Sequence, residues 1–265
     1  SEEVWVAVLD DGRVQGYAVD SAGWRPIAVA PDRLPAGMPP LLRLEGGKAH
    51  VVTVTAQTAS SLTHPVPPDG QDRLAYVDTT GGLVFEAGAD AATLTLKALA
   101  DARILADEAG RLLLLADATT RYAHGALGDT VEAGAIVLVD AKETPTVSTT
   151  ITIPGAGVVE GVSPIWTDLD GDGTREIVVT VSDASGGARI VAYDETGQVA
   201  AEGPAVGAGF RWRHQLAVAP FGPNGETELA VMLTPHIGGT VEFYRMRGDA
   251  LEIVARLPGP TSHVN

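Results

Sequence analysis

The sequence predicts an all-β fold, and within that class a β-propeller of four-stranded antiparallel blades. Helical periodicity is almost absent along the 265 residues. Short runs rich in Val, Leu and Ile instead alternate with Gly, Asp and Pro at a spacing of about ten residues. These runs recur as a similar unit of about fifty residues, which is typical of sheets repeated radially.

The repeat is clearest in the C-terminal half, where residues 174–197 align with residues 226–250. In this alignment Glu176 falls on Glu228, and each segment holds two apolar runs separated by a double glycine. One further run precedes each pair and one follows it. Each unit therefore has four predicted strands, as in a propeller blade.

Weaker copies continue toward the N-terminus, where the first unit has only three runs. The last residues, PGPTSHVN, resemble the start of a strand, so we expect them to complete the first unit and close the ring. A longer natural chain would have more blades. The sequence thus predicts one domain, 1–265, of five blades with the approximate bounds 1–38 plus 260–265, 39–97, 98–158, 159–210 and 211–259.

The amino-acid composition excludes several classes of binding partner and of structural site. A formal charge of −16 disfavours nucleic acid and anionic lipid, which need a basic footprint. The absence of cysteine excludes disulfides and Cys-zinc sites. No apolar run approaches the roughly 18 residues that a spanning helix needs. The chain starts at Ser1 rather than Met, as removal of a leader would leave it, although an arbitrary boundary would look the same. We expect a monomer that binds carbohydrate, an acidic small ligand or another protein.

The stretch DLDGDGTRE at 168–176 predicts a calcium loop. Its carboxylates and one backbone carbonyl can converge on one centre as the hard oxygen ligands that Ca²⁺ prefers. Magnesium fits less well because it demands a stricter octahedron. The alternative is a polar Asp-Gly hairpin without a metal. The expected ligands are Asp168, Asp170, Asp172, the carbonyl of Thr174, and Glu176.

This loop resembles the calcium loop of the FG-GAP/VCBS repeat family, in which it joins the first two strands of a blade. The Asp-x-Asp-x-Asp-Gly part matches, and Glu176 stands where the family pattern has Asp. The corresponding loop at 220–228 lacks the acidic pattern, so we expect one structural calcium. The resemblance implies a propeller with an extracellular adhesion or recognition role, and hence a secreted, cell-surface or periplasmic protein.

Propeller loops sort onto two faces, and five of the six histidines fall on the face opposite the calcium loop. Arginines and aromatics share these loops. Such a face can bind a carboxylated or phosphorylated ligand, stack a sugar on Trp212, or hold a transition metal through imidazoles. An alternative is that RWRH at 211–214 caps a blade junction with Trp212 buried. The candidate ligand-binding residues are His64, Arg121, His124, Glu160, Arg211, Trp212 and His263.

Three functions remain open. The first is a calcium-stabilised module that binds glycan or another acidic ligand, and we favour it because common catalytic motifs such as Gly-x-Ser-x-Gly and His-Glu-x-x-His are absent. The second is an enzyme resembling polysaccharide lyases or sugar dehydratases. The third is a structural scaffold. For the enzyme, the candidate residues are His214 or His236 as base, Tyr122 as acid and Arg213 as charge clamp.

Overall fold

The prediction of an all-β protein is confirmed by a computed structural model. It describes residues 3–37, 40–46, 48–54, 57–68, 73–122, 124–125, 128–142, 144–235 and 239–260. Within these ranges the chain forms β-strands and no helix, so no helix there is long and apolar enough to span a bilayer. The named strands pair antiparallel, apart from one parallel contact between β17 and β21.

The N-terminal part of the chain forms three small sheets, with the orders β1-β2-β3, β4-β5 and β6-β7-β8. Their strands are β1 (Glu3–Val8), β2 (Val14–Asp20), β3 (Gly23–Ile27), β4 (Leu41–Glu45), β5 (Lys48–Val52), β6 (Leu74–Val77), β7 (Gly82–Ala87) and β8 (Asp90–Thr95).

The C-terminal part forms three successive four-stranded antiparallel meanders, β9–β12, β14–β17 and β18–β21. Short β13 bridges the first two, and the β17–β21 contact joins the last two. The strands are β9 (Leu105–Ala106), β10 (Arg111–Thr119), β11 (Glu132–Asp140), β12 (Thr146–Thr152), β13 (Val158–Val159), β14 (Ile165–Thr167), β15 (Glu176–Asp183), β16 (Gly187–Tyr193), β17 (Val199–Glu202), β18 (Arg213–Ala219), β19 (Glu228–Leu233), β20 (Thr240–Arg247) and β21 (Ala250–Pro258).

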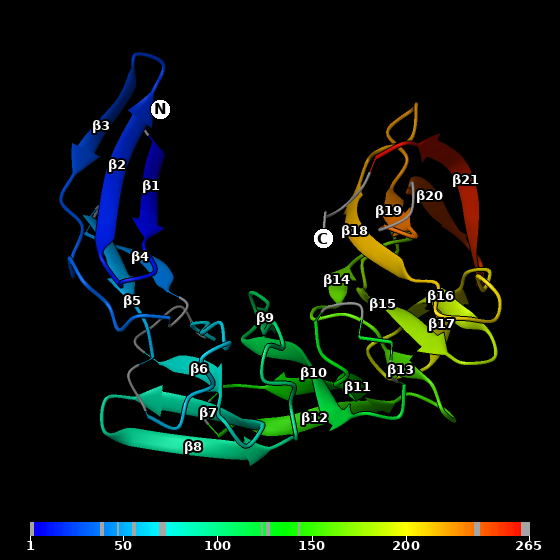
Figure 1. Ribbon diagram of the computed structural model, residues 1–265, viewed down its shortest axis with the longest axis horizontal. Helices are drawn as coiled ribbons and strands as arrows, with labels where there is room; N and C mark the ends of the chain where they lie inside the picture. Colours follow the sequence, from blue (N-terminus) through cyan, green and yellow to red (C-terminus); the bar gives the residue numbers. More distant parts are fainter. Residues whose placement is uncertain are drawn as a thin grey trace.

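The sheets follow one another along an open arc, with the first sheet at one end and the last meander at the other (Figure 1). Segments 98–158, 159–210 and 211–259 each contain one four-stranded meander. Segment 39–97 differs from the expected single blade, because it contains the two-stranded sheet β4-β5 and the separate sheet β6-β7-β8. The expected closing segment, 261–265, lies outside the described residues.

Apolar cores lie between successive sheets. One core joins β6 and β7 to β10 and β11, a second joins β10 and β11 to β15 and β16, and a third joins β15 and β16 to β19 and β20. The strands β10, β11 and β15 are buried on both faces, which explains why they read as continuous apolar runs rather than alternating ones.

Candidate ligand-binding site and acidic loop

A pocket of about 510 Å³ lies where loops from the three meanders meet. Its wall combines the segment after β10, the crossing from β17 to β18, and the residues at and after the end of β19. The lining residues are His124, Val206, Phe210, Arg211, Trp212, Leu233, Thr234 and Pro235. Three of the predicted ligand-binding residues, His124, Arg211 and Trp212, are therefore brought together.

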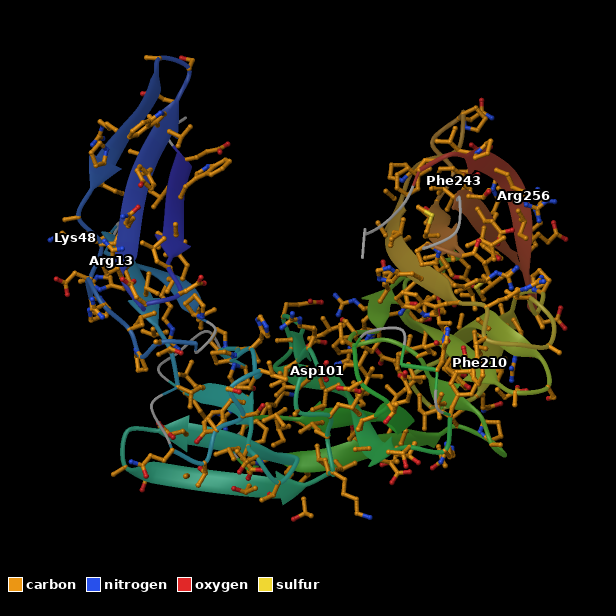
Figure 2. The ribbon with its side chains drawn as sticks, viewed as in Figure 1. Arg13, Lys48, Asp101, Phe210, Phe243 and Arg256 are labelled. Atoms are coloured by element: carbon orange, nitrogen blue, oxygen red, sulfur yellow. The ribbon has the colours of Figure 1, made fainter. Side chains whose placement is uncertain are left out.

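Phe210 is the open aromatic wall of this pocket, with 58% of its surface exposed. Its ring lies 5.2 Å from the imidazole of His124 at an interplanar angle of 18°, and 5.3 Å from the ring of Tyr122. Figure 2 labels Phe210 in the C-terminal half of the arc. Sequence reasoning missed this residue, although it directly precedes the predicted RWRH segment.

Glu160 holds His124 in place from below the pocket. The Nδ1 of His124 donates to Oε1 of Glu160, whose side chain is fully buried. The other carboxylate oxygen of Glu160 accepts a hydrogen bond of 2.5 Å from Ser182 Oγ. Since Nδ1 is occupied by Glu160, Nε2 is the ring nitrogen left for a ligand.

Further acids surround this dyad. Glu132 is 3% exposed, and burial together with the charges of Glu160, Asp129 and Asp101 raises the pKa of its carboxyl to about 8. Burial also raises the pKa of Asp101, which Figure 2 labels near the middle of the arc. The pKa of Tyr122 is raised to about 12, mainly by burial and then by Glu160. The raised pKa favours the protonated form of the Glu132 carboxyl at neutral pH.

Trp212 is only 2% exposed, so stacking of a sugar on its face, one of the options that the sequence left open, is not available. Its Nε1 donates to the carbonyl of Glu160 at 3.2 Å, and its ring stacks on His214 with centroids 4.8 Å apart. Trp212 thus ties the crossing before β18 to the loop after β13, which agrees with the alternative of a buried cap. The exposed aromatic surface belongs to Phe210.

Arg213 is buried, is not among the residues that line the pocket, and pairs with Glu242 at 3.1 Å between Nε and Oε2. Its Nη1 also donates to the backbone carbonyls of Ala188 and Pro204. Because these acceptors occupy the guanidinium, the geometry does not fit the expected charge clamp on a ligand.

The other predicted residues of this face are dispersed. Arg121 donates from Nε to the carbonyl of Gly157 at 3.0 Å, which anchors it to the backbone. His64 forms an isolated parallel bridge with Arg103 and is absent from the pocket wall. His236 and His263 lie outside the described residues.

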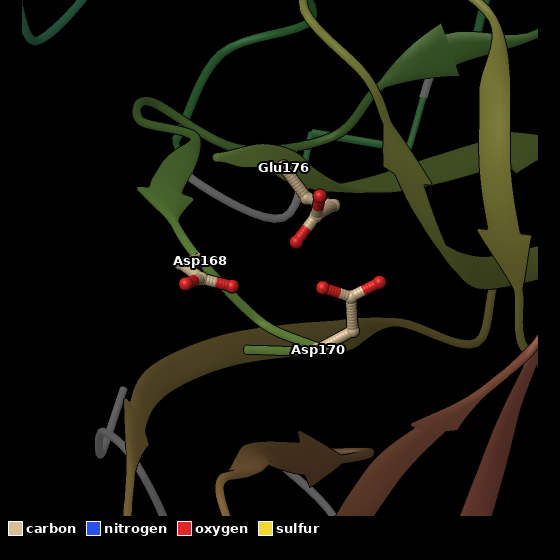
Figure 3. A group of neighbouring side chains, drawn as sticks. All are labelled: Asp168, Asp170 and Glu176. Carbon is tan, nitrogen blue, oxygen red and sulfur yellow. The ribbon is translucent and has the colours of Figure 1, made fainter. Parts of the chain in front are cut away.

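The acidic loop lies at the opposite end of β15. Asp168, Asp170 and Glu176 each offer a carboxylate oxygen within 4.8 Å of the others (Figure 3). Among the described residues this is the one group of three acidic or imidazole ligands close enough for a metal. Glu176 is buried at the start of β15, and its Oε2 accepts a hydrogen bond of 2.8 Å from Leu169 N. The buried side chain of Leu169 anchors the loop in the third core.

Asp172, another predicted ligand, is not part of this group of three. Asp172 accepts hydrogen bonds from the backbone N and Oγ1 of Thr174 at 2.7 and 2.6 Å. Burial, and then the charges of Asp170, Asp172 and Asp168, raise the pKa of Glu176. Within the described part of the chain, no arginine or lysine pairs with the three clustered carboxylates. A hard divalent cation such as Ca²⁺ fits this oxygen-only, mutually repelling set.

Comparisons with known proteins add little to this picture. No family model matches the chain. No curated protein matches it either. Among solved structures the chain is similar to AofleA from Arthrobotrys oligospora, at 10% identity and a TM-score of 0.37, over 99% of this chain and 94% of that one.

Proposed function

We propose that this protein is a calcium-stabilised binding module that recognises a glycan bearing a carboxylate, or another acidic ligand, in the pocket at His124, Phe210 and Arg211. The observation that carries the proposal is the exposed ring of Phe210 next to the exposed guanidinium of Arg211 in a pocket of about 510 Å³. This volume lies within the range of small-ligand sites.

The two side chains offer complementary chemistry. An exposed aromatic ring packs against the apolar face of a sugar. Arginine presents paired N–H groups that match the two oxygens of a carboxylate. His124, oriented by Glu160, adds one more polar contact through Nε2. The aromatic wall therefore supplies affinity for a ring, and Arg211 supplies preference for an acidic one.

The proposal includes a propeller architecture, in which the successive antiparallel sheets are blades around one axis. The calcium ion belongs to the loop of Asp168, Asp170 and Glu176, at the other end of β15 from the pocket. Extracellular modules of this kind bind calcium with Kd values on the order of 10⁻⁴–10⁻³ M, which suits a secreted, cell-surface or periplasmic location. The calcium stabilises the loop and does not contact the ligand.

Calorimetric titration with acidic and neutral oligosaccharides tests the proposal. Phe210→Ala is expected to weaken binding of both about tenfold, the effect of a loss of about 1.4 kcal/mol. Arg211→Ala is expected to weaken only the acidic ligand. Phe221→Ala removes an aromatic ring that is 45% exposed and absent from the pocket wall, and it serves as the matched control. Failure of every acidic oligosaccharide to bind, or equal binding by the Phe210 variant, overturns the proposal.

The His124–Glu160 pair favours one alternative, a lyase. A carboxylate-oriented imidazole can act as a general base, so Nε2 of His124 would take the proton alpha to the sugar carboxylate while the bond to the leaving oxygen breaks. In this version His124 replaces His214 as the candidate base. An unsaturated sugar product, detected by its ultraviolet absorbance and lost in His124→Ala, would favour it. If neither ligand binding nor turnover is found, the third function, a structural scaffold, is favoured.

A further inference from the structure

A second pocket, with a volume of about 540 Å³, lies between the first two C-terminal meanders. It is lined by β9 and the turn that follows it, by β14 and the residue before it, and by the residue that precedes β15 (Figure 1). The lining combines apolar side chains, including Leu105, Ile165 and Trp166, with the charged side chains of Asp107, Glu108 and Arg175. Among the described residues it shares none with the pocket at His124. Its volume lies within the range of small-ligand sites.

Trp166 is held in place by polar and charged partners. Its indole Nε1 donates to Oε1 of Glu195 at 2.9 Å. The guanidinium groups of Arg111 and Arg175 lie 4.9 and 5.4 Å from the centroid of its ring. Leu105 and Trp166 both pack against the second core and are only partly buried, so part of their apolar surface stays accessible. An apolar group of a ligand can pack on this surface.

Arg175 pairs with two acids of very different exposure. Its Nη2 donates to both carboxylate oxygens of Glu108 at 2.8 Å, and its Nη1 donates to Oδ2 of Asp107 at 3.3 Å. The side chain of Asp107 is 2% exposed, whereas that of Glu108 is 78% exposed. Because exposed ion pairs contribute little to stability, a ligand can replace Arg175 as the partner of Glu108 at small cost. The buried Asp107 then keeps the guanidinium of Arg175 in position.

We propose that this pocket binds a free α-amino acid with a large apolar side chain. The ligand carboxylate accepts hydrogen bonds from Arg175, whose paired N–H groups match two carboxylate oxygens. The ligand ammonium donates to Glu108, and the ligand side chain packs on Leu105, Ile165 and Trp166.

The direct contact between Arg175 and Glu108 selects this class of ligand. A zwitterion exchanges their single ion pair for two, so it leaves neither residue without a partner. A ligand with one charge satisfies only one of the two residues. Because Arg175 and Glu108 are in hydrogen-bond contact, the two ligand charges must also be close together. An α-amino acid carries both on one carbon atom, whereas a peptide separates them. The inference concerns a different pocket from the proposed glycan site and does not depend on it.

Calorimetric titration with free amino acids tests the proposal, at a fixed calcium concentration that keeps the acidic loop in one state. We expect L-leucine to bind at a single site. L-leucinamide lacks the carboxylate and 4-methylpentanoate lacks the ammonium, so each is expected to bind at least about tenfold more weakly. Equal binding of L-leucine and both analogues overturns the proposal. Absence of binding by L-leucine, L-methionine and L-phenylalanine overturns it as well.

Two substitutions test the role of each charge. Arg175→Gln is expected to weaken binding of L-leucine and to abolish its preference over L-leucinamide, because the carboxylate loses its partner. Glu108→Gln is expected to abolish the preference over 4-methylpentanoate, because the ammonium loses its partner. These preferences are ratios measured on the folded protein, so a loss of stability does not imitate them. Unchanged preferences in both variants overturn the proposal.

The matched control is a second exposed ion pair, between Nη1 of Arg247 and Oε2 of Glu252 at 3.2 Å. Its side chains are 56% and 51% exposed, and neither residue lines the pocket. Arg247→Gln and Glu252→Gln are expected to keep the wild-type affinity and both preferences. Equal losses in these controls would assign the effect to overall charge and overturn the proposal. Titration with acidic oligosaccharides reports on the other pocket, so failure of one site is distinguishable from failure of the other.

Discussion

The imidazole of His124 lies nearly parallel to the ring of Phe210, with 5.2 Å between the ring centroids. His124 follows β10, whereas Phe210 precedes β18, so the stack joins the first and the last of the three meanders. Glu160, fully buried between them, holds His124 by its Nδ1. A buried carboxylate thus helps to position the exposed aromatic wall of the pocket.

The buried acids beneath this stack make stability depend on pH. The unfolded chain releases the proton of Glu132 near the ordinary pKa of 4.5, whereas the folded chain keeps it until about pH 8. The folded state therefore binds more protons between these values, and the free energy of unfolding falls with rising pH by up to about 1.4 kcal/mol per unit. Urea unfolding at intervals from pH 5 to pH 8 measures this slope.

Glu132→Gln mimics the protonated carboxyl, so we expect it to flatten this slope and to stabilise the protein most at pH 8. Glu252→Gln, at an exposed position on β21, is the control and is expected to keep the wild-type slope. Equal slopes for wild type and Glu132→Gln would contradict the assignment.

Arg213 is expected to stabilise the fold and to leave ligand binding to other residues. Its removal leaves Glu242, which is 1% exposed, with less compensation in the core. Arg213→Met is expected to lower the free energy of unfolding by about 3 to 5 kcal/mol, as for other broken buried ion pairs. Adding Glu242→Gln is expected to restore part of it. Denaturant unfolding checks both values, and ligand affinity of the folded fraction should stay unchanged. A pure affinity loss without destabilisation would instead support the charge clamp.

Calcium is expected to raise the melting temperature through Asp168, Asp170 and Glu176. A ligand that binds only the folded state at 100 times its Kd stabilises it by about 2.7 kcal/mol. Asp170→Asn is expected to abolish the rise in melting temperature that calcium causes. In the presence of a calcium chelator, the same substitution is expected to be neutral or stabilising, because it relieves repulsion between the carboxylates. Scanning fluorimetry with and without calcium measures the shift. Asp90→Asn, an exposed change on β8, should respond to calcium as the wild type does.

The turn between β15 and β16 requires glycine at position 187. Gly187 has φ of +68°, and a Cβ there would lie 2.2 Å from the carbonyl oxygen of Gly207. Gly187→Ala is expected to destabilise by more than the roughly 1 kcal/mol that a left-handed alanine alone costs. Gly248→Ala, at φ of +59° with open space around it, isolates that smaller cost. Similar losses in the two variants, measured by urea unfolding, would refute the steric argument.

Local pattern was sufficient to predict much of the fold. The three C-terminal meanders follow from apolar runs whose spacing repeats, because both hairpin turns and strand lengths are local properties. The acidic loop was likewise readable, since its ligands lie within nine consecutive positions, 168–176. Segment 39–97 was harder, because residues 53–73 form isolated bridges and no strand among those described there, so β5 and β6 belong to different sheets.

The pocket depended on contacts between distant positions. Glu132 reads as an ordinary strand residue, and only burial beside Glu160 gives it an unusual proton affinity. Phe210 and Trp212 alternate in a short loop, yet one is exposed and the other buried. That choice is made by Glu160, whose backbone carbonyl accepts the Trp212 indole N–H. The periodicity of the sequence around Trp212 does not reveal a hydrogen-bond partner that is so distant in the chain.

The run of four leucines in β10, 112–115, has a consequence for how the strand finds its place. All four are fully buried, and they alternate between two different cores. If β10 shifted by one residue relative to its partner strands, leucine would replace leucine in the middle of both cores. Apolar packing at these positions therefore differs little between the native register and the shifted one. The native register must be specified by the turn that precedes β10. There Asp107 accepts hydrogen bonds from the backbone N–H groups of Ala109 and Arg111 at 3.0 and 2.8 Å. The register of β10 is thus selected by a polar turn, whereas the four leucines stabilise the strand without selecting its register.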